Sequence, residues 1–484
     1  MADLTEPPDR SSAPGKRDRG LGMLYWVFGV LVVLALLWTW WSHQVNSAHQ
    51  RLLQEARQAA SGISVKEVPD EDNAARDYER AYDLFTMPAR EYGSKFSYRL
   101  AIFELDIGSE EIEGMLAGNA RCLLALAEAA AKPDCVFVAD YSKGIATRLP
   151  SLLNARSATL LLCMAARRAA HDGRHGEAAE RLRQALCLAR GIGQPRFLIC
   201  HMISVAGEDI VIEALRDILV QSDPDEDALR AMLAMLREHG ERRRPFRESM
   251  HVERLLDMLL AAEIGAGAAY PYSDWKATAW FRLRRSAGRV LRDAREWERL
   301  WDRAEEAYGK PCPQALRELT ALTKSPEYAR QSQVAGSPYS LVAFSFLATW
   351  RSDAEELALL RCARLAVACR LHQARTGKLP ESLAELAGYF PTDFAEVATD
   401  PFSGQQMLYK RSETGFTVYS VGIWKPGDDG APRPHEIVRD PDLTFPVDRK
   451  AWEAERAQVI QRRQQRAKAV SPAKPPPPPP APRR

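Results

Sequence analysis

Local catalytic motifs are what this chain of 484 residues most clearly lacks. It has no GxSxG elbow, no HExxH pair, no Walker A loop and no GxGxxG fingerprint. We therefore name no catalytic, cofactor-binding or metal-ligating residue, and we expect no cofactor. A catalytic triad can assemble from residues far apart in sequence, so an envelope hydrolase stays open as an alternative.

Paired cysteines are also missing. None of the eight cysteines forms a CxxC pair, which argues against a zinc ribbon or a thioredoxin-like site. Cys362 and Cys369 fall on one predicted helix, roughly 10 Å apart along its axis, which is too far for a disulfide. We expect buried free thiols, with disulfides as the alternative in an oxidising compartment. His171 and His175 flank a predicted helix turn, and we do not interpret them as a metal pair.

The chain has almost no net charge, at +2, so no global attraction to nucleic acid is expected. Two stretches are nevertheless rich in arginine, "ERRRPFR" (241–247) and "WKATAWFRLRRSAGRVLRDAREWERLW" (275–301). The second could rest on an anionic membrane surface. The simpler interpretation is a solvated helix face whose tryptophans are anchored in the core.

One long apolar run stands out against this background. Residues 22–41 carry no charge and would form a helix of about 30 Å, which matches the hydrocarbon core of a bilayer. Tyrosine and tryptophan mark both ends, as at membrane interfaces. Basic residues precede the run: Arg10, Lys16, Arg17 and Arg19. These features predict a single-pass signal-anchor in the inner (cytoplasmic) membrane.

In this orientation residues 1–21 are cytoplasmic and the bulk of the chain is extracytoplasmic. A cleaved signal peptide is the alternative. It is disfavoured because the run is long, is bulky with tryptophan and lacks a clean small-x-small cleavage site.

Residues 46–356 are rich in alanine, leucine, arginine and glutamate, and we expect one extracytoplasmic helical domain there. Residues 110–132 show helical spacing of apolar residues. A second helix is predicted over 222–240, with Ser222 or Asp223 as N-cap, Pro224 at the first position and a stop at Gly240. Further breaks are expected at these places: Gly173, Gly191–Pro195 and Pro245. Such helices suit antiparallel hairpins.

Within this body, residues 161–190 read "LLCMAARRAAHDGRHGEAAERLRQALCLAR". Gly173, Ala178, Leu182 and Ala185 fall where a tetratricopeptide-type hairpin has small or apolar residues, and the segment resembles one such repeat. The resemblance implies a surface for protein partners. No second copy follows at the repeat spacing, so an ordinary helical hairpin is the alternative.

Residues 357–431 are predicted to form a small unit, called the cassette below, in which a helix is followed by a β-hairpin. The helix is predicted over 357–376 and stops at Gly377, after which Pro380 opens a short helix. In "TDPFSG", Asp400 would brace a turn and Gly404 would take a positive φ. "QQMLYKR" and "TGFTVYSVG" then alternate as two strands of a β-hairpin, with the turn at 413–415.

The order G-x-L-P, D-P-F-S-G, Y-S-V-G and D-D-G resembles the C-terminal region of type II secretion major pseudopilins, as found in uncharacterised bacterial membrane-anchored proteins. The resemblance implies a hairpin folded over the end of the long helix. In the pseudopilins that helix is itself the membrane segment, which here lies far upstream, so we do not interpret the chain as a pilus subunit. The family's acidic loop can bind calcium, but we interpret Asp428 and Asp429 as a solvated turn.

Residues 449–484 begin with a predicted basic helix of little apolar face and end in the disordered, proline-rich "SPAKPPPPPPAPRR". We interpret them as a solvated extension, with contact to an anionic envelope polymer or a partner groove as the alternative.

The sequence thus predicts a mainly α fold with a transmembrane helix, a hairpin- or solenoid-like helical body and a small α+β cassette. We expect a membrane-anchored helical scaffold or interaction protein of the bacterial envelope rather than an enzyme. An accessory component of a secretion-like apparatus is a further alternative. The expected partners are membrane lipid through residues 22–41 and envelope proteins, but not nucleic acid.

Overall fold

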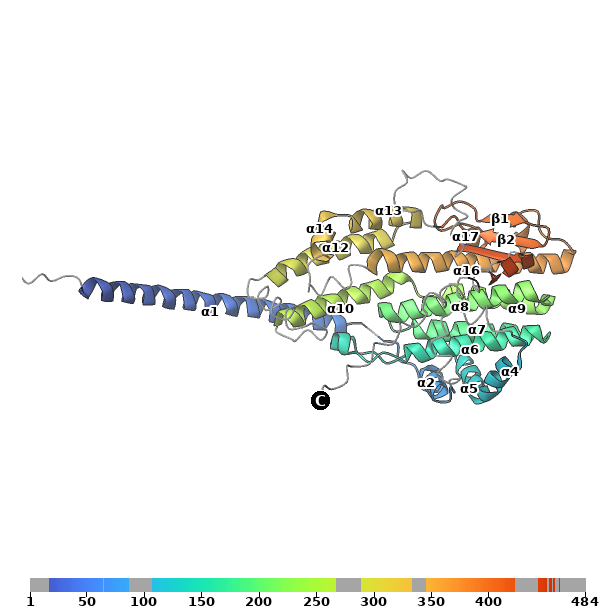
Figure 1. The fold of residues 1–484 in the computed structure, drawn as a ribbon, viewed down its shortest axis with the longest axis horizontal. Coiled ribbons are helices and arrows are strands. Elements are labelled where there is room, and N and C mark those ends of the chain that lie inside the picture. Colours follow the sequence, from blue (N-terminus) through green and yellow to red (C-terminus); the bar gives the residue numbers. More distant parts are fainter. Residues whose placement is uncertain are drawn as a thin grey trace, which may run out of the picture.

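The computed structural model describes residues 17–63, 65–86, 107–266, 289–332, 345–422, 443–450, 452–454, 456–457 and 461. The fold is mainly helical, with one apolar N-terminal helix and a small three-stranded antiparallel sheet near the C-terminus (Figure 1). The predicted fold class is confirmed.

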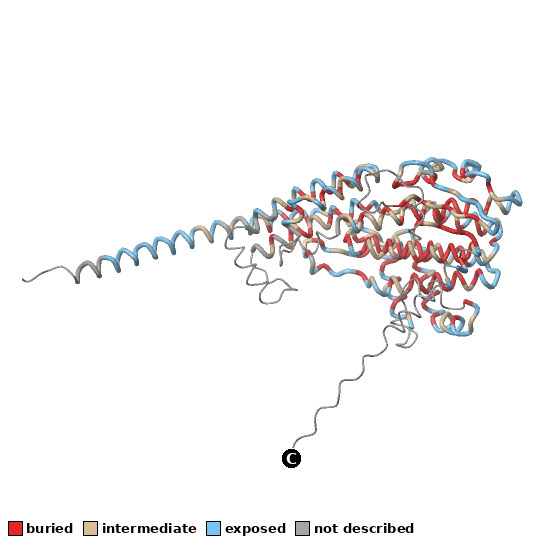
Figure 2. The backbone as a smooth tube through the Cα atoms, turned by 45° about the horizontal axis from the view of Figure 1, so that its top comes forward, coloured by how far each residue is buried: buried red, intermediate tan, exposed pale blue. Residues whose placement is uncertain are grey.

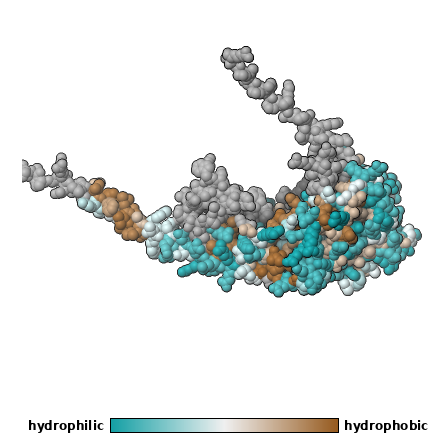
Figure 3. Space-filling view, turned by 90° about the horizontal axis from the view of Figure 1, so that it is seen from below, coloured by the Kyte–Doolittle hydropathy of each residue, from teal (hydrophilic) through white to brown (hydrophobic). Residues whose placement is uncertain are grey.

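Helix α1 (Arg17–Ser61) extends from the body as a single rod (Figure 1). Its segment Met23–Gln44 is long and apolar enough to cross a membrane and is not buried against the body. Figure 3 shows this apolar band on the projecting helix, and Figure 2 shows that it is exposed. The last turns of α1 do pack, with Leu53 and Ala56 against Leu259 of α10 (Phe246–Ala266).

The other helices form the body and follow one another along the chain: α2 (Ala75–Asp83), α4 (Glu110–Gly118), α5 (Ala120–Ala130), η1 (Tyr141–Ala146), α6 (Leu152–His171), α7 (His175–Ile192), α8 (Leu198–Gln221), α9 (Glu226–Arg242), α12 (Arg289–Tyr308), α13 (Cys312–Thr323), α14 (Pro326–Ser332), α16 (Ser345–Thr376), η2 (Leu383–Tyr389) and α17 (Phe394–Val397). The strands are β1 (Leu408–Arg411), β2 (Gly415–Tyr419) and β3 (Thr444–Asp448).

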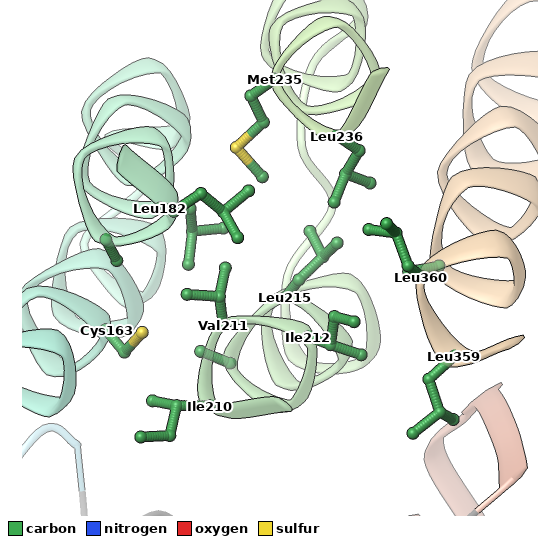
Figure 4. Close-up of a cluster of buried hydrophobic side chains, with 14 of the residues drawn as sticks. Cys163, Leu182, Ile210, Val211, Ile212, Leu215, Met235, Leu236, Leu359 and Leu360 are labelled. Atoms are coloured by element: carbon green, nitrogen blue, oxygen red, sulfur yellow. The ribbon is translucent and has the colours of Figure 1, made fainter. Parts of the chain in front are cut away.

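Helix α8 is the centre of the core, and it contacts α6 and α7 on one side and α16 on another. Figure 4 shows Val211 of α8 pointing toward Leu182 of α7, and Ile212 pointing toward Leu360 of α16. A helix with apolar residues on all faces is stable only when it is surrounded. Each fully buried leucine, isoleucine or valine side chain contributes roughly 1.5–3 kcal/mol.

The breaks predicted at Gly173, at Gly191–Pro195 and at Pro245 are confirmed, since helices end or begin at each of them. Gly173 has φ 77°, which a residue with a Cβ rarely adopts. Helices α6 and α7 therefore form the hairpin predicted over 161–190. Its resemblance to a tetratricopeptide repeat stays a prediction.

Both predicted boundaries of the helix over 222–240 are wrong. Helix α9 begins at Glu226, because Asp225 Oδ1 accepts the amide of Ala228 at 2.8 Å and is the N-cap. Ser222 instead donates to the Ile218 carbonyl at 2.8 Å, so neither it nor Asp223 caps the helix, and Pro224 lies before it. Gly240 lies inside α9, which continues to Arg242.

The apolar stretch 110–132 is two helices rather than one, because Asn119 interrupts it. The Asn119 side chain accepts the Thr86 amide at 2.8 Å and donates to the Met115 carbonyl at 2.9 Å. A side-chain amide that bonds the backbone in this way competes with the helix. Asn119 thereby ties the α4–α5 corner to the chain that follows α2.

The cassette has the predicted helix, turn and hairpin. Helix α16 ends at Thr376, before Gly377 with φ 76°, and Gly404 has φ 68°. The short helix after it, η2, begins at Leu383 rather than at Pro380. Asp400 does brace its turn, since Oδ1 accepts the Phe402 amide at 2.8 Å.

Strand β2 pairs on both sides, with Phe416 opposite Arg411 of β1 and opposite Val447 of β3. The side chains of Phe416 and Val418 are buried, and β2 and β3 both pack on α16. The third strand was not predicted, and Pro446 in its middle is a residue that is unfavourable in a central strand. As β3 lies at one end of the strand order, a proline is tolerated there.

The arginine-rich stretch 275–301 is described only from residue 289, as part of α12. Trp297 and Trp301 are buried and both donate from Nε1 to Asp257 Oδ2 of α10, each at 3.3 Å. This confirms the interpretation of aromatic anchors for these two residues. Burial raises the pKa of Asp257 well above its ordinary value, and the nearby Glu253 carboxyl adds to the effect.

The tail is not wholly a solvated extension, since Trp452 is buried and donates to Asp217 of α8. The described residues from 449 onward are helical, as predicted. The proline-rich end, and Asp428 and Asp429 with their loop, lie outside the described residues. All eight cysteines are free, and five of them are buried.

Candidate functional site

A cavity of about 500 Å³ lies where α7 and α9 end and the chain leaves α1. Its lining is strongly basic. Six cationic side chains contribute, against the single carboxylate of Asp134: Lys66, Lys132, Arg190, Arg196, Arg242 and Arg244. Aromatic rings and two thiols complete the wall, including Tyr78, Tyr141, Cys135 and Cys187.

The stretch "ERRRPFR" (241–247) supplies two of the arginines that line the cavity. Its backbone conformation determines which two. Helix α9 ends at Arg242, and Pro245 disfavours helical geometry for the residue before it. Arg243 is extended, with ψ 129°. Successive side chains on an extended backbone point to opposite sides. Arg242 and Arg244 therefore line the cavity, while the Arg243 side chain turns away from it toward the buried Glu208.

Arg190 and Arg242 share one carboxylate at one end of the cavity. Glu238 Oε1 lies 3.2 Å from Arg242 Nη1 and 3.9 Å from Arg190 Nη2. The second distance is too long for a hydrogen bond. Nη2 of Arg190 instead donates to the thiol of Cys187 at 3.5 Å, which is a weak acceptor.

Arg196 and Arg244 share a second carboxylate in the same way. Glu248 Oε2 accepts from Arg244 Nη1 at 2.5 Å and lies 3.7 Å from Arg196 Nε. Arg244 also donates to Gln194 Oε1 at 2.8 Å. With both pairs counted, four guanidinium charges face two carboxylates, which leaves two positive charges in excess among the residues that the structure describes.

The two lysines, by contrast, are each matched by an acid. Lys66 Nζ donates to both oxygens of Asp134 at 2.8 Å. Lys132 Nζ lies 2.5 Å from Asp77 Oδ2 and donates to the Asp70 carbonyl at 2.9 Å. These contacts tie the segment after α1 to the segment after α5, and they position the cavity wall.

Cys135 is held as a thiol against α7. A Cβ on Gly191 would lie 2.7 Å from Cys135 Sγ, so only glycine allows this approach. Burial raises the pKa of Cys135 well above its ordinary value, and Arg190 only partly opposes that shift. A thiolate is the reactive form of cysteine, so this environment does not activate Cys135 as a nucleophile.

Behind the cavity Arg243 organises a buried ionic network. It donates from Nε to Glu208 at 2.9 Å and from Nη2 to Asp353 at 2.7 Å. His201 Nε2 lies 2.8 Å from Asp353, and His239 Nε2 lies 3.1 Å from Glu208. Burial raises the pKa of Glu208, but the charge of Arg243 and the contact with His239 outweigh it and lower the pKa to about 2.

This network joins α8, α9 and α16 and has little contact with solvent, since Glu208 is 3% exposed and His239 is 1% exposed. Nearby on α16, burial raises the pKa of Glu356 well above its ordinary value, and the charges of Asp209 and Glu208 add to the effect. We assign these groups a structural role, because a substrate could not reach them without opening the core.

No site residue was predicted, and the cavity shows which signal was missed. The arginines of 241–247 and the break at Gly191–Pro195 were both noted, but sequence spacing does not show that they meet. His171 and His175 lie at the turn between α6 and α7, and His171 Nδ1 is 3.3 Å from Asp172. In the part of the chain that the structure describes, no group of three or more histidine, cysteine or acidic residues could hold a metal ion.

Comparison with known proteins adds no family: no family model, no curated protein and no solved structure matches the chain significantly. The function is therefore argued from the contacts and charges of the chain itself.

Proposed function

We propose that this protein is a single-pass, membrane-anchored scaffold of the bacterial envelope, whose helical body lies outside the cytoplasm and binds other envelope proteins. One observation carries the proposal. Helix α1 is continuous from an exposed apolar stretch, Met23–Gln44, to turns that pack into the body. An apolar helix that none of the described residues covers would be stable in a bilayer, where the hydrocarbon core surrounds it.

The distribution of charge supports the proposed orientation. Arg17 and Arg19 belong to α1 just before its apolar stretch, and further basic residues precede them. Basic flanks favour the cytoplasmic side. Beyond Gln44, residues 45–52 extend α1 by about 12 Å at 1.5 Å per residue before Leu53 packs against α10. The body would thus begin just outside the membrane, where it is open to partners.

The body offers an apolar surface for such partners. A second cavity of about 680 Å³ is lined in part by Val68, Val138 and Leu149, with Arg76 and Arg148 beside them. Val138 is 90% exposed, and Leu153 nearby in sequence is 76% exposed. Apolar groups with a polar rim are typical of protein interaction sites.

Topology is tested first, by protease accessibility in intact spheroplasts. We expect added protease to digest the body, while a tag on the N-terminus stays protected. Protection of the body would place it in the cytoplasm and refute the orientation.

Partner binding is tested by in vivo cross-linking from a photoreactive residue at Val138. The control is the same residue at Arg230, an exposed position on α9. We expect discrete adducts with envelope proteins from position 138 only. Equal adducts from both positions, or none from either, would contradict a specific binding surface there.

A further inference from the structure

We propose that the basic cavity at the ends of α7 and α9 binds a small soluble polyanion, a ligand with at least two negative charges on phosphate or carboxylate oxygens. The inference goes beyond the scaffold role and holds on either side of the membrane. Its basis is the pair of shared glutamates, which leave two guanidinium charges without a matching carboxylate in the described part of the chain.

Hydrogen-bond donors are in excess as well as charge. A guanidinium has five N–H donors. Arg190 lies 3.9 Å from its nearest paired carboxylate and Arg196 lies 3.7 Å from its own, so neither contact is a hydrogen bond. Both side chains line the cavity. Phosphate and carboxylate oxygens are the acceptors that guanidinium groups bind most strongly.

Tyr141 adds a neutral donor at the same wall. Its hydroxyl oxygen accepts the backbone amide of Arg196 at 3.0 Å, which uses a lone pair and leaves the O–H hydrogen to donate. The residue is 4% exposed, and burial raises the pKa of its hydroxyl, so it is protonated at neutral pH. This contact also fixes the segment that carries Arg196.

The arginines that line the cavity differ in how far their side chains are exposed, and exposure increases from the inner wall to the mouth. The Arg190 side chain is 15% exposed and Arg244 is 19% exposed, while Arg242 at the end of α9 is 55% exposed. Coulomb attraction strengthens as water is excluded, so the inner pair would hold the anion most tightly. The exposed arginine would guide it in.

Size and position favour a soluble ligand. A volume of about 500 Å³ lies within the range of small-molecule sites, roughly 300–1,000 Å³. Val65 and Lys66 in its wall follow the end of α1. That end is about 25 Å along the helix from the membrane-spanning segment. A headgroup of the anchoring bilayer is therefore too far away to enter.

The test is isothermal titration calorimetry with the full chain in phosphatidylcholine nanodiscs, using inorganic pyrophosphate and citrate as probes. We expect saturable binding of at least one probe at one site per chain, weakened by added salt. Arg196→Gln should lower the affinity at least tenfold. The matched control Arg230→Gln removes an equally charged, exposed arginine outside the cavity and should leave the affinity unchanged.

A thermal melt of each variant shows whether it is folded. If Arg196→Gln is not, Arg242→Gln at the exposed mouth decides, with an expected loss of at least threefold. The proposal would be overturned if neither probe shows saturable binding. It would also be overturned if the cavity variant binds the probe with the same affinity as the Arg230→Gln control. Displacement of pyrophosphate by added phosphatidylglycerol vesicles would overturn the assignment to a soluble ligand and point to a lipid headgroup.

Discussion

Trp452 Nε1 donates a hydrogen bond of 2.6 Å to Asp217 Oδ1, although the two residues lie 235 positions apart. Asp217 belongs to α8, and its other oxygen lies 3.0 Å from Arg167 Nη2 of α6. The chain after β3 therefore closes the packing of the two central helices and is part of the folded body.

Replacing Trp452 with alanine removes a buried ring and the donor to Asp217. We expect a loss of about 3 kcal/mol of unfolding free energy. Trp452→Phe keeps most of the apolar contact and loses the hydrogen bond, so about 1 kcal/mol is expected. Thermal denaturation of the full chain in detergent measures both. A wild-type melting temperature for Trp452→Ala would refute the docking of this segment.

Asp257→Asn should change how stability depends on pH. The raised pKa means that the folded protein binds a proton that the unfolded chain releases above about pH 4. This group therefore lowers stability as pH rises. Asparagine stays neutral and can still accept from Trp297 and Trp301. We expect the variant to gain stability relative to wild type between pH 4 and pH 8, as measured by melting temperature. A difference that does not change with pH would contradict the assignment.

Glu208→Gln should be costly at neutral pH, because Arg243 then loses one of its two carboxylates. Breaking a buried ion pair from one side costs roughly 3–5 kcal/mol. The pKa of Glu208 is lowered to about 2, so its contribution is complete above the unfolded value of about 4.3 and is lost as pH falls toward 2. Chemical denaturation at pH 7 and pH 3 should show a smaller difference at pH 3. The control is Glu241→Gln, a carboxylate on α9 whose side chain is 67% exposed.

Gly191→Ala should destabilise the cavity wall, because the new Cβ would lie 2.7 Å from Cys135 Sγ. We expect a loss of about 1–3 kcal/mol, as in other overpacked sites. Cys135→Ala in the same chain removes the sulfur and should restore much of the stability. A double-mutant cycle of melting temperatures tests this. If the two losses simply add, the close approach is not the cause.

Features that depend on neighbouring residues were predictable from the sequence. The stop at Gly377, the turn braced by Asp400 and the break at Pro245 each follow from the conformational preference of one residue. The apolar run in α1 was equally clear, since its length and composition need no tertiary context.

Features that depend on distant contacts were not predictable. Asn119 breaks a helix because Thr86 lies beside it, and β3 forms despite Pro446 because β2 offers an edge. The basic cavity likewise depends on contacts between residues that are far apart in the sequence. Its charge excess arises only when Arg190 and Arg244, from different helix ends, reach the same space.

Helix α1 has no glycine or proline between its membrane-spanning segment and its packed end, so it contains no hinge. One stiff helix consequently connects the membrane-spanning segment to the body. A tilt of the membrane segment would be passed to the body, and so would a rotation about its own axis. At 3.6 residues per turn, each residue added or removed between them would turn the body by about 100° relative to the membrane. The length of this connection therefore sets which face of the body looks toward the bilayer.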